Sequence, residues 1–222
     1  MKPLRTFCSI VAAQLLLGAV AVFGQSYKVE SIGGPSAPDV TKSVQDLLNP
    51  QGIRVVSDQG RPWCEMWVRK TVPASPNPTK SADMLYGALS EGTFLGVVHF
   101  PNAAADFRGQ ALKPGYYTLR YALIPQDGNH MGVNPYRDTV VLGPLAADTQ
   151  PETALNYEGL VKLSRQASGT PHPAILVMQP VGGTTFPSAV KDDQGYWDVE
   201  LKLQDQNGEL PIALTVVGKW SG

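Results

Sequence analysis

The residue types that could support chemistry are concentrated in one long loop, residues 125–138. Functional side chains favour such loops because a rigid scaffold can hold them at the surface. Positions 1, 3, 6 and 12 of a calcium-loop spacing are filled by Asp127, Asn129, Gly132 and Asp138. Positions 5 and 9, which should also provide oxygen ligands, hold Met131 and Pro135. The pattern suggests a ligand or cation site, with a purely structural loop as the alternative.

Three more polar or aromatic residues complete the predicted contact region in this loop: His130, Tyr136 and Arg137. In the structural alternative, Asp and Asn side chains bond to their own backbone and shape the turn. Arg137 and Asp138 would then be neighbours on the surface. Both interpretations predict a long connection between two strands.

The three histidines of the chain are His99, His130 and His172. Three imidazoles can hold zinc, but zinc sites usually place close pairs of ligands on one element. These histidines are 31 and 42 residues apart, so a shared metal requires the fold to bring them together. A blue-copper site is not indicated, because Cys64 has no nearby histidine after it. The sequence assigns no cofactor and leaves Ca²⁺ and Zn²⁺ open.

A second candidate surface is the strand face that carries Trp63, Glu65 and Trp67. Two indole rings flanking a carboxylate could stack on sugar rings while the acid accepts hydrogen bonds from hydroxyl groups. The alternative is burial of this face under a helix at residues 40–48, because large apolar side chains seldom stay in water without a reason. The opposite face of the strand carries Cys64, which we interpret as a packed core residue.

Sequence motifs for nucleophilic catalysis, metalloprotease chemistry and phosphate binding are absent. The chain lacks G-x-S-x-G, S-x-x-K, H-E-x-x-H and G-x-x-x-x-G-K-[ST]. A pair of carboxylates working as acid and base leaves no local signature and stays open. The carboxylates considered for that role are Glu65, Asp106, Asp127 and Asp138.

The elements that must position these residues are mostly strands. Apolar alternation predicts strands at residues 27–32, 53–56, 63–69, 94–100, 116–123, 139–142, 174–178 and 197–203. It also predicts a last strand whose inner face carries Ile212, Leu214, Val216 and Trp220. Helical spacing predicts one helix at residues 39–48, with Asp39 as its N-cap, and another within residues 154–165. We therefore expect a mainly β fold, an antiparallel β-sandwich with one or two short helices.

The N-terminal 24 residues have the layout of a secretory signal peptide: Lys2 and Arg5, then an apolar run, then Gly24 before the expected cleavage point. Cleavage would remove 24 of 222 residues and leave 198, which suits one β-sandwich domain over 25–222, with residues 25–70 forming a helix and hairpin unit packed on it. Cys8 would leave with the signal, so Cys64 would have no disulfide partner.

Charge excludes two classes of partner. After loss of Lys2 and Arg5, 16 basic residues face 19 acidic ones, a net charge of −3. Without a basic excess we expect no binding to nucleic acid or to an anionic membrane surface. Signal cleavage would also leave no integral membrane segment. The sequence does not identify the partner and leaves a glycan or a protein open.

Residues 109–119, GQALKPGYYTL, resemble the "L-x-P-G-x-Y-x-L" hairpin of secreted bacterial β-sandwich modules, including immunoglobulin-like and transthyretin-like ones. The Pro-Gly pair turns the chain while alternate Tyr and Leu residues enter the core. As a whole, the chain is similar to exported proteins of unknown function from soil bacteria. The resemblance implies architecture and assigns no catalytic residue.

Taken together, the sequence predicts a secreted or periplasmic β-sandwich protein that works as a non-enzymatic binding or interaction module. Its loop at residues 125–138 would be the contact region. The alternative is an extracytoplasmic hydrolase that uses paired carboxylates or a bound metal ion.

Overall fold

The computed structural model describes residues 25–35, 40–128, 130, 132 and 134–220. The predicted signal peptide at residues 1–24 lies outside them. The strands are β1 (Tyr27–Ile32), β2 (Gly52–Ser57), β3 (Pro62–Val68), β4 (Phe94–Phe100), β5 (Ala104–Ala105), β6 (Ala111–Leu112), β7 (Gly115–Leu123), β8 (Asp138–Pro144), β9 (Ala174–Gln179), β10 (Ser188–Lys191), β11 (Trp197–Asp205) and β12 (Gly208–Val217). The helices are α1 (Lys42–Leu47), a 3₁₀ turn at Leu145–Ala147, and α2 (Tyr157–Ser168).

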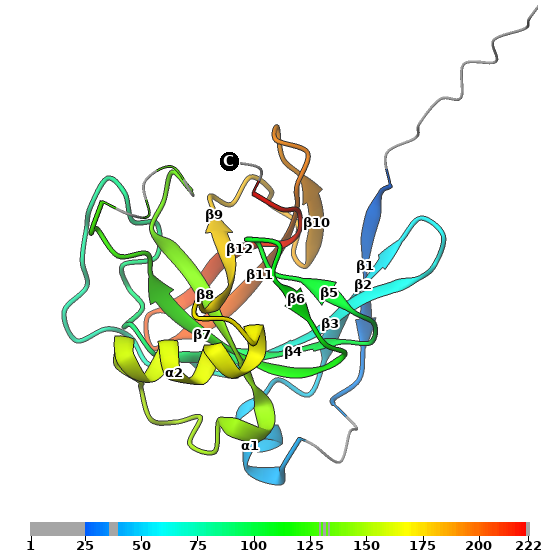
Figure 1. The fold of residues 1–222 in the computed structure, drawn as a ribbon. Coiled ribbons are helices and arrows are strands. Elements are labelled where there is room, and N and C mark those ends of the chain that lie inside the picture. Colours follow the sequence, from blue (N-terminus) through cyan, green and yellow to red (C-terminus); the bar gives the residue numbers. More distant parts are fainter. Residues whose placement is uncertain (1–24, 36–39, 129, 131, 133, 221–222) are drawn as a thin grey trace, which may run out of the picture.

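Ten strands form one antiparallel sheet in the order β1-β2-β3-β4-β7-β8-β9-β12-β11-β10. The sheet curls until its two ends meet, because β1 is in contact with β10 (Figure 1). Strands β9 and β12 are the least extensively paired neighbours in this sheet, because they pair at only two positions, Gln179 with Ala213 and Met178 with Leu214. The short β5–β6 hairpin lies outside this sheet. The predicted mainly β, antiparallel fold with two short helices is confirmed.

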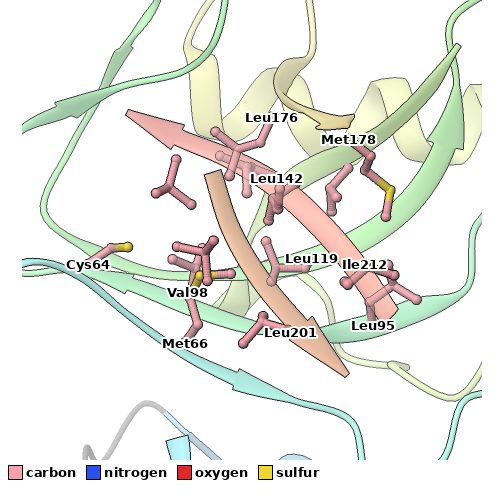
Figure 2. Close-up of a cluster of buried hydrophobic side chains, with 14 of the residues drawn as sticks. Cys64, Met66, Leu95, Val98, Leu119, Leu142, Leu176, Met178, Leu201 and Ile212 are labelled. Carbon is pink, nitrogen blue, oxygen red and sulfur yellow. The ribbon is translucent and has the colours of Figure 1, made fainter. Parts of the chain in front are cut away.

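The main hydrophobic core fills the inside of the curled sheet (Figure 2). Strand geometry explains which residues enter it, because alternate side chains point to opposite faces. In β7 the residues Tyr117, Leu119 and Tyr121 are buried in this core, as the sequence predicted. The same core takes residues from β2, β3, β4, β8, β9, β11 and β12, so both halves of the sheet share one interior.

The two helices cover the outer face of the sheet. Helix α1 begins after Thr41, whose side-chain oxygen accepts from the Val44 N–H, and its apolar side packs on Trp67 and Phe94. Asp39, the predicted N-cap, lies outside the described residues. Helix α2 begins after Asn156, which caps the Gly159 N–H at 2.9 Å, and ends at Gly169 in the left-handed conformation. It lies against β8, with smaller contacts to β7 and β9 (Figure 1).

Residues 109–119 differ from the expected hairpin in one respect. Leu112 enters the main core and Tyr117 and Leu119 follow it, as the resemblance implied. However, β6 pairs with β5 and not with β7. The hydroxyl of Tyr117 donates to the carbonyl of Lys113 at 2.7 Å and closes the bend between them.

Within the described residues, no helix is long and apolar enough to cross a bilayer.

Candidate functional site

A cleft of about 510 Å³ lies between α2 and the outer face of β7, β8 and β9. We call it the α2 cleft. It is less open to solvent than a hollow of about 590 Å³ beside Gly52 and Ile53 of β2. The volume of the α2 cleft falls within the range of roughly 300–1,000 Å³ that small-molecule sites occupy. Its wall residues come from seven segments of the chain: Arg108, residues 122–125, His130, Thr139 and Val141 of β8, α2, residues 171–175 and Trp220.

The floor of the α2 cleft is apolar because the outer face of the central strands is apolar here. Ala122 of β7, Val141 of β8 and Ile175 of β9 form a small cluster with Leu160 of α2. That cluster is separate from the main core. The continuously apolar strand β9 therefore contributes side chains to both the main core and this outer cluster. Helix α2 covers the outer cluster only partly.

Close approach of α2 to β8 depends on one glycine. A Cβ atom at Gly143 would lie 2.6 Å from Cγ and Cδ2 of Leu163, a distance at which something must move. Ser164 of α2 strengthens the attachment, because its hydroxyl lies 2.8 Å from the Ala174 N–H and accepts from it. These contacts fix the last turns of the helix.

The rim of the α2 cleft is basic. Four of its lining side chains can carry positive charge, and the lining contains no Asp or Glu among the described residues. The four are Arg108, His130, Arg165 and His172. All four are accessible to solvent: Arg108 and His130 are half-buried, and Arg165 and His172 are exposed.

Hydrogen bonds tie together the segments that carry three of these basic residues. The Gln110 side chain donates to the Pro173 carbonyl at 2.9 Å and accepts from the Thr170 hydroxyl, which joins the turn after Arg108 to the loop that holds His172. Arg165 Nε donates to the Pro171 carbonyl at 2.7 Å. The Arg108, Arg165 and His172 segments therefore form one connected end of the cleft.

Asp106 anchors the turn that presents Arg108. It is fully buried, and its carboxylate accepts from the Gln110 N–H at 2.7 Å and from the Ile175 N–H at 3.1 Å. Burial raises the pKa of Asp106 above its ordinary value, although these hydrogen bonds act in the opposite direction. Its carboxylate is occupied by backbone donors, which suits a structural anchor.

His130 is the part of the predicted loop that reaches the α2 cleft. Its Nδ1 lies 2.8 Å from Asp127 Oδ1, so the carboxylate orients the imidazole ring. His130 also lines a second, shallower hollow of about 320 Å³ together with Tyr136 and Arg137. Asp127 and Tyr136 are therefore both next to His130, Asp127 through its carboxylate and Tyr136 along the wall of the second hollow. Asn129 lies outside the described residues.

The calcium-loop spacing is not reproduced by Asp138. This residue begins β8 and is fully buried. Its carboxylate accepts from the N–H groups of Leu85 and Tyr86, at 2.7 and 2.9 Å, and from the Tyr121 hydroxyl at 2.7 Å. Arg137 is not a surface partner of Asp138: its Nε donates to the Ile124 carbonyl and lies 4.0 Å from Asp83. Among the described residues, no three His, Cys, Asp or Glu side chains are grouped as metal ligands.

The histidines separate into two places. His130 and His172 both line the α2 cleft. His99 lies on β4, where its Nδ1 is 3.0 Å from Glu65 Oε2 and its ring stacks on Tyr116 with centroids 4.2 Å apart. The sequence could not show this division, because it depends on which strands pair.

Trp63, Glu65 and Trp67 do not form one exposed platform. Trp67 is only 3 % exposed under α1, and its indole N–H donates to the Gly33 carbonyl at 2.7 Å. Trp63 is the extra residue of an irregular β2–β3 register, packs against the main core and donates to the Val216 carbonyl at 2.8 Å. The irregular register breaks the alternation, so burial of Trp67, the alternative considered from the sequence, is what the structure shows.

Glu65 is instead part of a charged row on the outer face. Arg54 donates to Glu65 Oε1 through Nε and a terminal nitrogen, at 2.8 and 2.6 Å. Burial alone would raise the pKa of Glu65, but hydrogen bonds from His99 and Arg54 outweigh it and hold this pKa below its ordinary value. Glu65 is therefore a charged, fully partnered side chain.

Sequence reasoning missed Arg108, Arg165, Tyr157 and Trp220. Tyr157 is 45 % exposed and is the large hydrophobic side chain left open among the described residues. Trp220 does not lie on the inner face of the last strand, because β12 ends at Val217 and Trp220 packs against the outer cluster. Its backbone N–H donates to the Phe107 carbonyl at 2.8 Å, and its side chain lines the cleft. The available signal was weak: a bulky aromatic at the polar start of a helix and another after the last strand.

No family model, curated protein or solved structure matches the chain in comparisons with known proteins. The function is therefore inferred from the geometry of the α2 cleft.

Proposed function

We propose that this protein is an exported, non-enzymatic binding module that holds a small, mainly apolar ligand in the α2 cleft. The observation that supports this proposal is the cleft itself: about 510 Å³ of space over an apolar floor of Ala122, Val141, Leu160 and Ile175. Binding sites for small molecules have this composition, with few polar groups around an apolar surface.

Two aromatic side chains support the same proposal. Tyr157 and Trp220 both line the α2 cleft, and Tyr157 remains 45 % exposed. Aromatic rings supply large contact areas at low entropic cost when a ligand covers them. A ligand in the cleft would remove the Tyr157 ring from water, which gives the exposed ring a function.

The test is a titration with a neutral apolar fluorescent probe, N-phenyl-1-naphthylamine. We expect a saturable rise in fluorescence with one probe per protein. Val161 of α2 lines the cleft, so Val161→Trp should fill it and weaken probe binding at least tenfold. Lys162→Trp, one residue further along the same helix and exposed to solvent, is the matched control and should leave binding unchanged.

Two results would overturn this proposal. One is the absence of saturable probe binding by a protein with an unchanged melting temperature. The other is equal probe affinity in Val161→Trp and Lys162→Trp, because binding would then occur elsewhere on the molecule.

A further inference from the structure

We propose that the ligand of the α2 cleft is an amphipathic monoanion, a free long-chain carboxylate, whose head group binds between Arg108, Arg165 and His172. This inference rests on the proposed function and adds the chemical class of the ligand. The apolar chain would lie on the floor formed by Ala122, Val141 and Ile175.

The two arginines of the cleft differ from most other arginines in having no carboxylate partner in the described part of the chain. Four of the five other described arginines lie within 4.0 Å of a carboxylate: Arg54, Arg69, Arg120 and Arg137. The fifth, Arg61, is exposed and lies outside the cleft. Among the described residues, neither Arg108 nor Arg165 forms such an ion pair, and both line the cleft. A guanidinium group has a fixed planar set of donors that matches a carboxylate, so these two residues can supply what an anionic head group needs.

Hydrogen bonds connect the segments of Arg108 and Arg165 to the loop that carries His172. Gln110 holds the Arg108 turn against the loop of residues 170–173, and Arg165 donates to Pro171 in the same loop. The three segments that carry these basic side chains therefore form one hydrogen-bonded unit, which holds their backbones in place around one end of the cleft. Preorganised donors bind more tightly because less freedom is lost on binding.

The α2 cleft has a positively charged end and an apolar floor. An ion without an apolar tail would leave the open apolar part of the lining uncovered, including Tyr157. An uncharged apolar ligand would leave the guanidinium groups without a carboxylate. A long-chain carboxylate satisfies both parts of the lining. The position of the floor favours a single free molecule over the surface of a bilayer, because the floor is the outer face of β7, β8 and β9 and lies beneath α2.

The experiment compares dodecanoate with its uncharged counterpart dodecan-1-ol as competitors of N-phenyl-1-naphthylamine, using protein purified after expression of the full chain. At pH 8 we expect dodecanoate to displace the probe at a concentration at least tenfold lower than dodecan-1-ol. Arg108→Gln and Arg165→Gln should each weaken dodecanoate binding by about tenfold and leave dodecan-1-ol binding unchanged. Arg61→Gln, an exposed arginine outside the cleft, is the matched control and should change neither.

The outcomes separate the two proposals. Equal displacement by dodecanoate and dodecan-1-ol, with normal probe binding, would overturn the anionic ligand and leave the apolar binding function in place. Failure of the probe itself to bind would overturn the proposed function. Co-sedimentation with phosphatidylglycerol vesicles without displacement by free dodecanoate would overturn this inference in favour of a membrane-docking surface.

Discussion

Asp138 and Asp198 are both buried carboxylates, but they differ in the number of hydrogen bonds that they accept. Asp138 accepts three hydrogen bonds, two of them from backbone N–H groups that link residues 85–86 to β8. Asp198 is 6 % exposed and accepts one side-chain hydrogen bond, from the Thr215 hydroxyl at 2.6 Å. A charge with few donors is costly to bury, so ionised Asp198 destabilises the folded protein.

Replacement of Asp198 by Asn should stabilise the protein at neutral pH. Burial raises the pKa of Asp198 to about 6, opposed by the Thr215 hydrogen bond and assisted by the charges of Asp192 and Glu200. In the unfolded chain this pKa is about 4. Between these values the folded state binds more protons, so this residue's contribution to stability is full below about pH 4 and is lost as the pH rises through about 6.

Melting curves from pH 4 to pH 8 test this prediction. Asp198→Asn should melt higher than the parent protein at pH 8, and the difference should shrink toward pH 4. Asp193→Asn, an exposed neighbour in the turn between β10 and β11, should show no such trend. A lower melting temperature for Asp198→Asn at pH 8 would contradict the assignment.

At the level of secondary structure, the attachment of α2 to β8 is the contact on which the cleft depends. Gly143→Ala should destabilise the protein because the new Cβ would overlap Leu163. Leu163→Ala alone should cost about 2–5 kcal/mol, as buried leucine truncations do. In the double variant the methyl group has room, so its free energy of unfolding should exceed that expected from adding the two single effects.

Urea unfolding of the four proteins of this cycle measures the coupling. We also expect Gly143→Ala to weaken binding of N-phenyl-1-naphthylamine, because the helix forms one wall of the cleft. Strict additivity of the two substitutions would show that Gly143 and Leu163 do not touch in solution.

Local elements could be predicted from the sequence, but the cleft could not. The β11–β12 hairpin follows from alternation of Val199, Leu201 and Leu203 and from the turn at Asn207 and Gly208, all within about ten residues. Of the cleft, the sequence identified only the loop that contains His130. Arg108, Arg165 and Trp220 are joined by the packing of a helix and the end of the chain on the sheet, and nothing local encodes those distances.

The Trp63 and Trp67 face shows the other limit of sequence reasoning. Strict alternation places both indoles on one side of β3, and one unpaired residue in the β2–β3 register is enough to separate them. Such irregular registers depend on the partner strand. A period-2 pattern in one strand cannot reveal them.

At the scale of the whole molecule, the described chain should unfold in a single transition. The main core takes side chains from strands at both ends of the sequence, so neither half of the sheet has an interior of its own. Tryptophan fluorescence and far-ultraviolet circular dichroism should give coincident urea curves. Separate midpoints, with β10, β11 and β12 (residues 188–217) unfolding apart from the rest, would show that the protein divides where β9 pairs with β12 at only two positions.

The contact between β1 and β10 has a further consequence for behaviour at high concentration. A chain this rich in strands usually risks growing into fibrils, because the outermost strand of an open sheet offers its backbone to the next molecule. Here the two outermost strands shield one another. Curling the sheet back on itself thus supplies a built-in resistance to aggregation that does not rely on a large net charge.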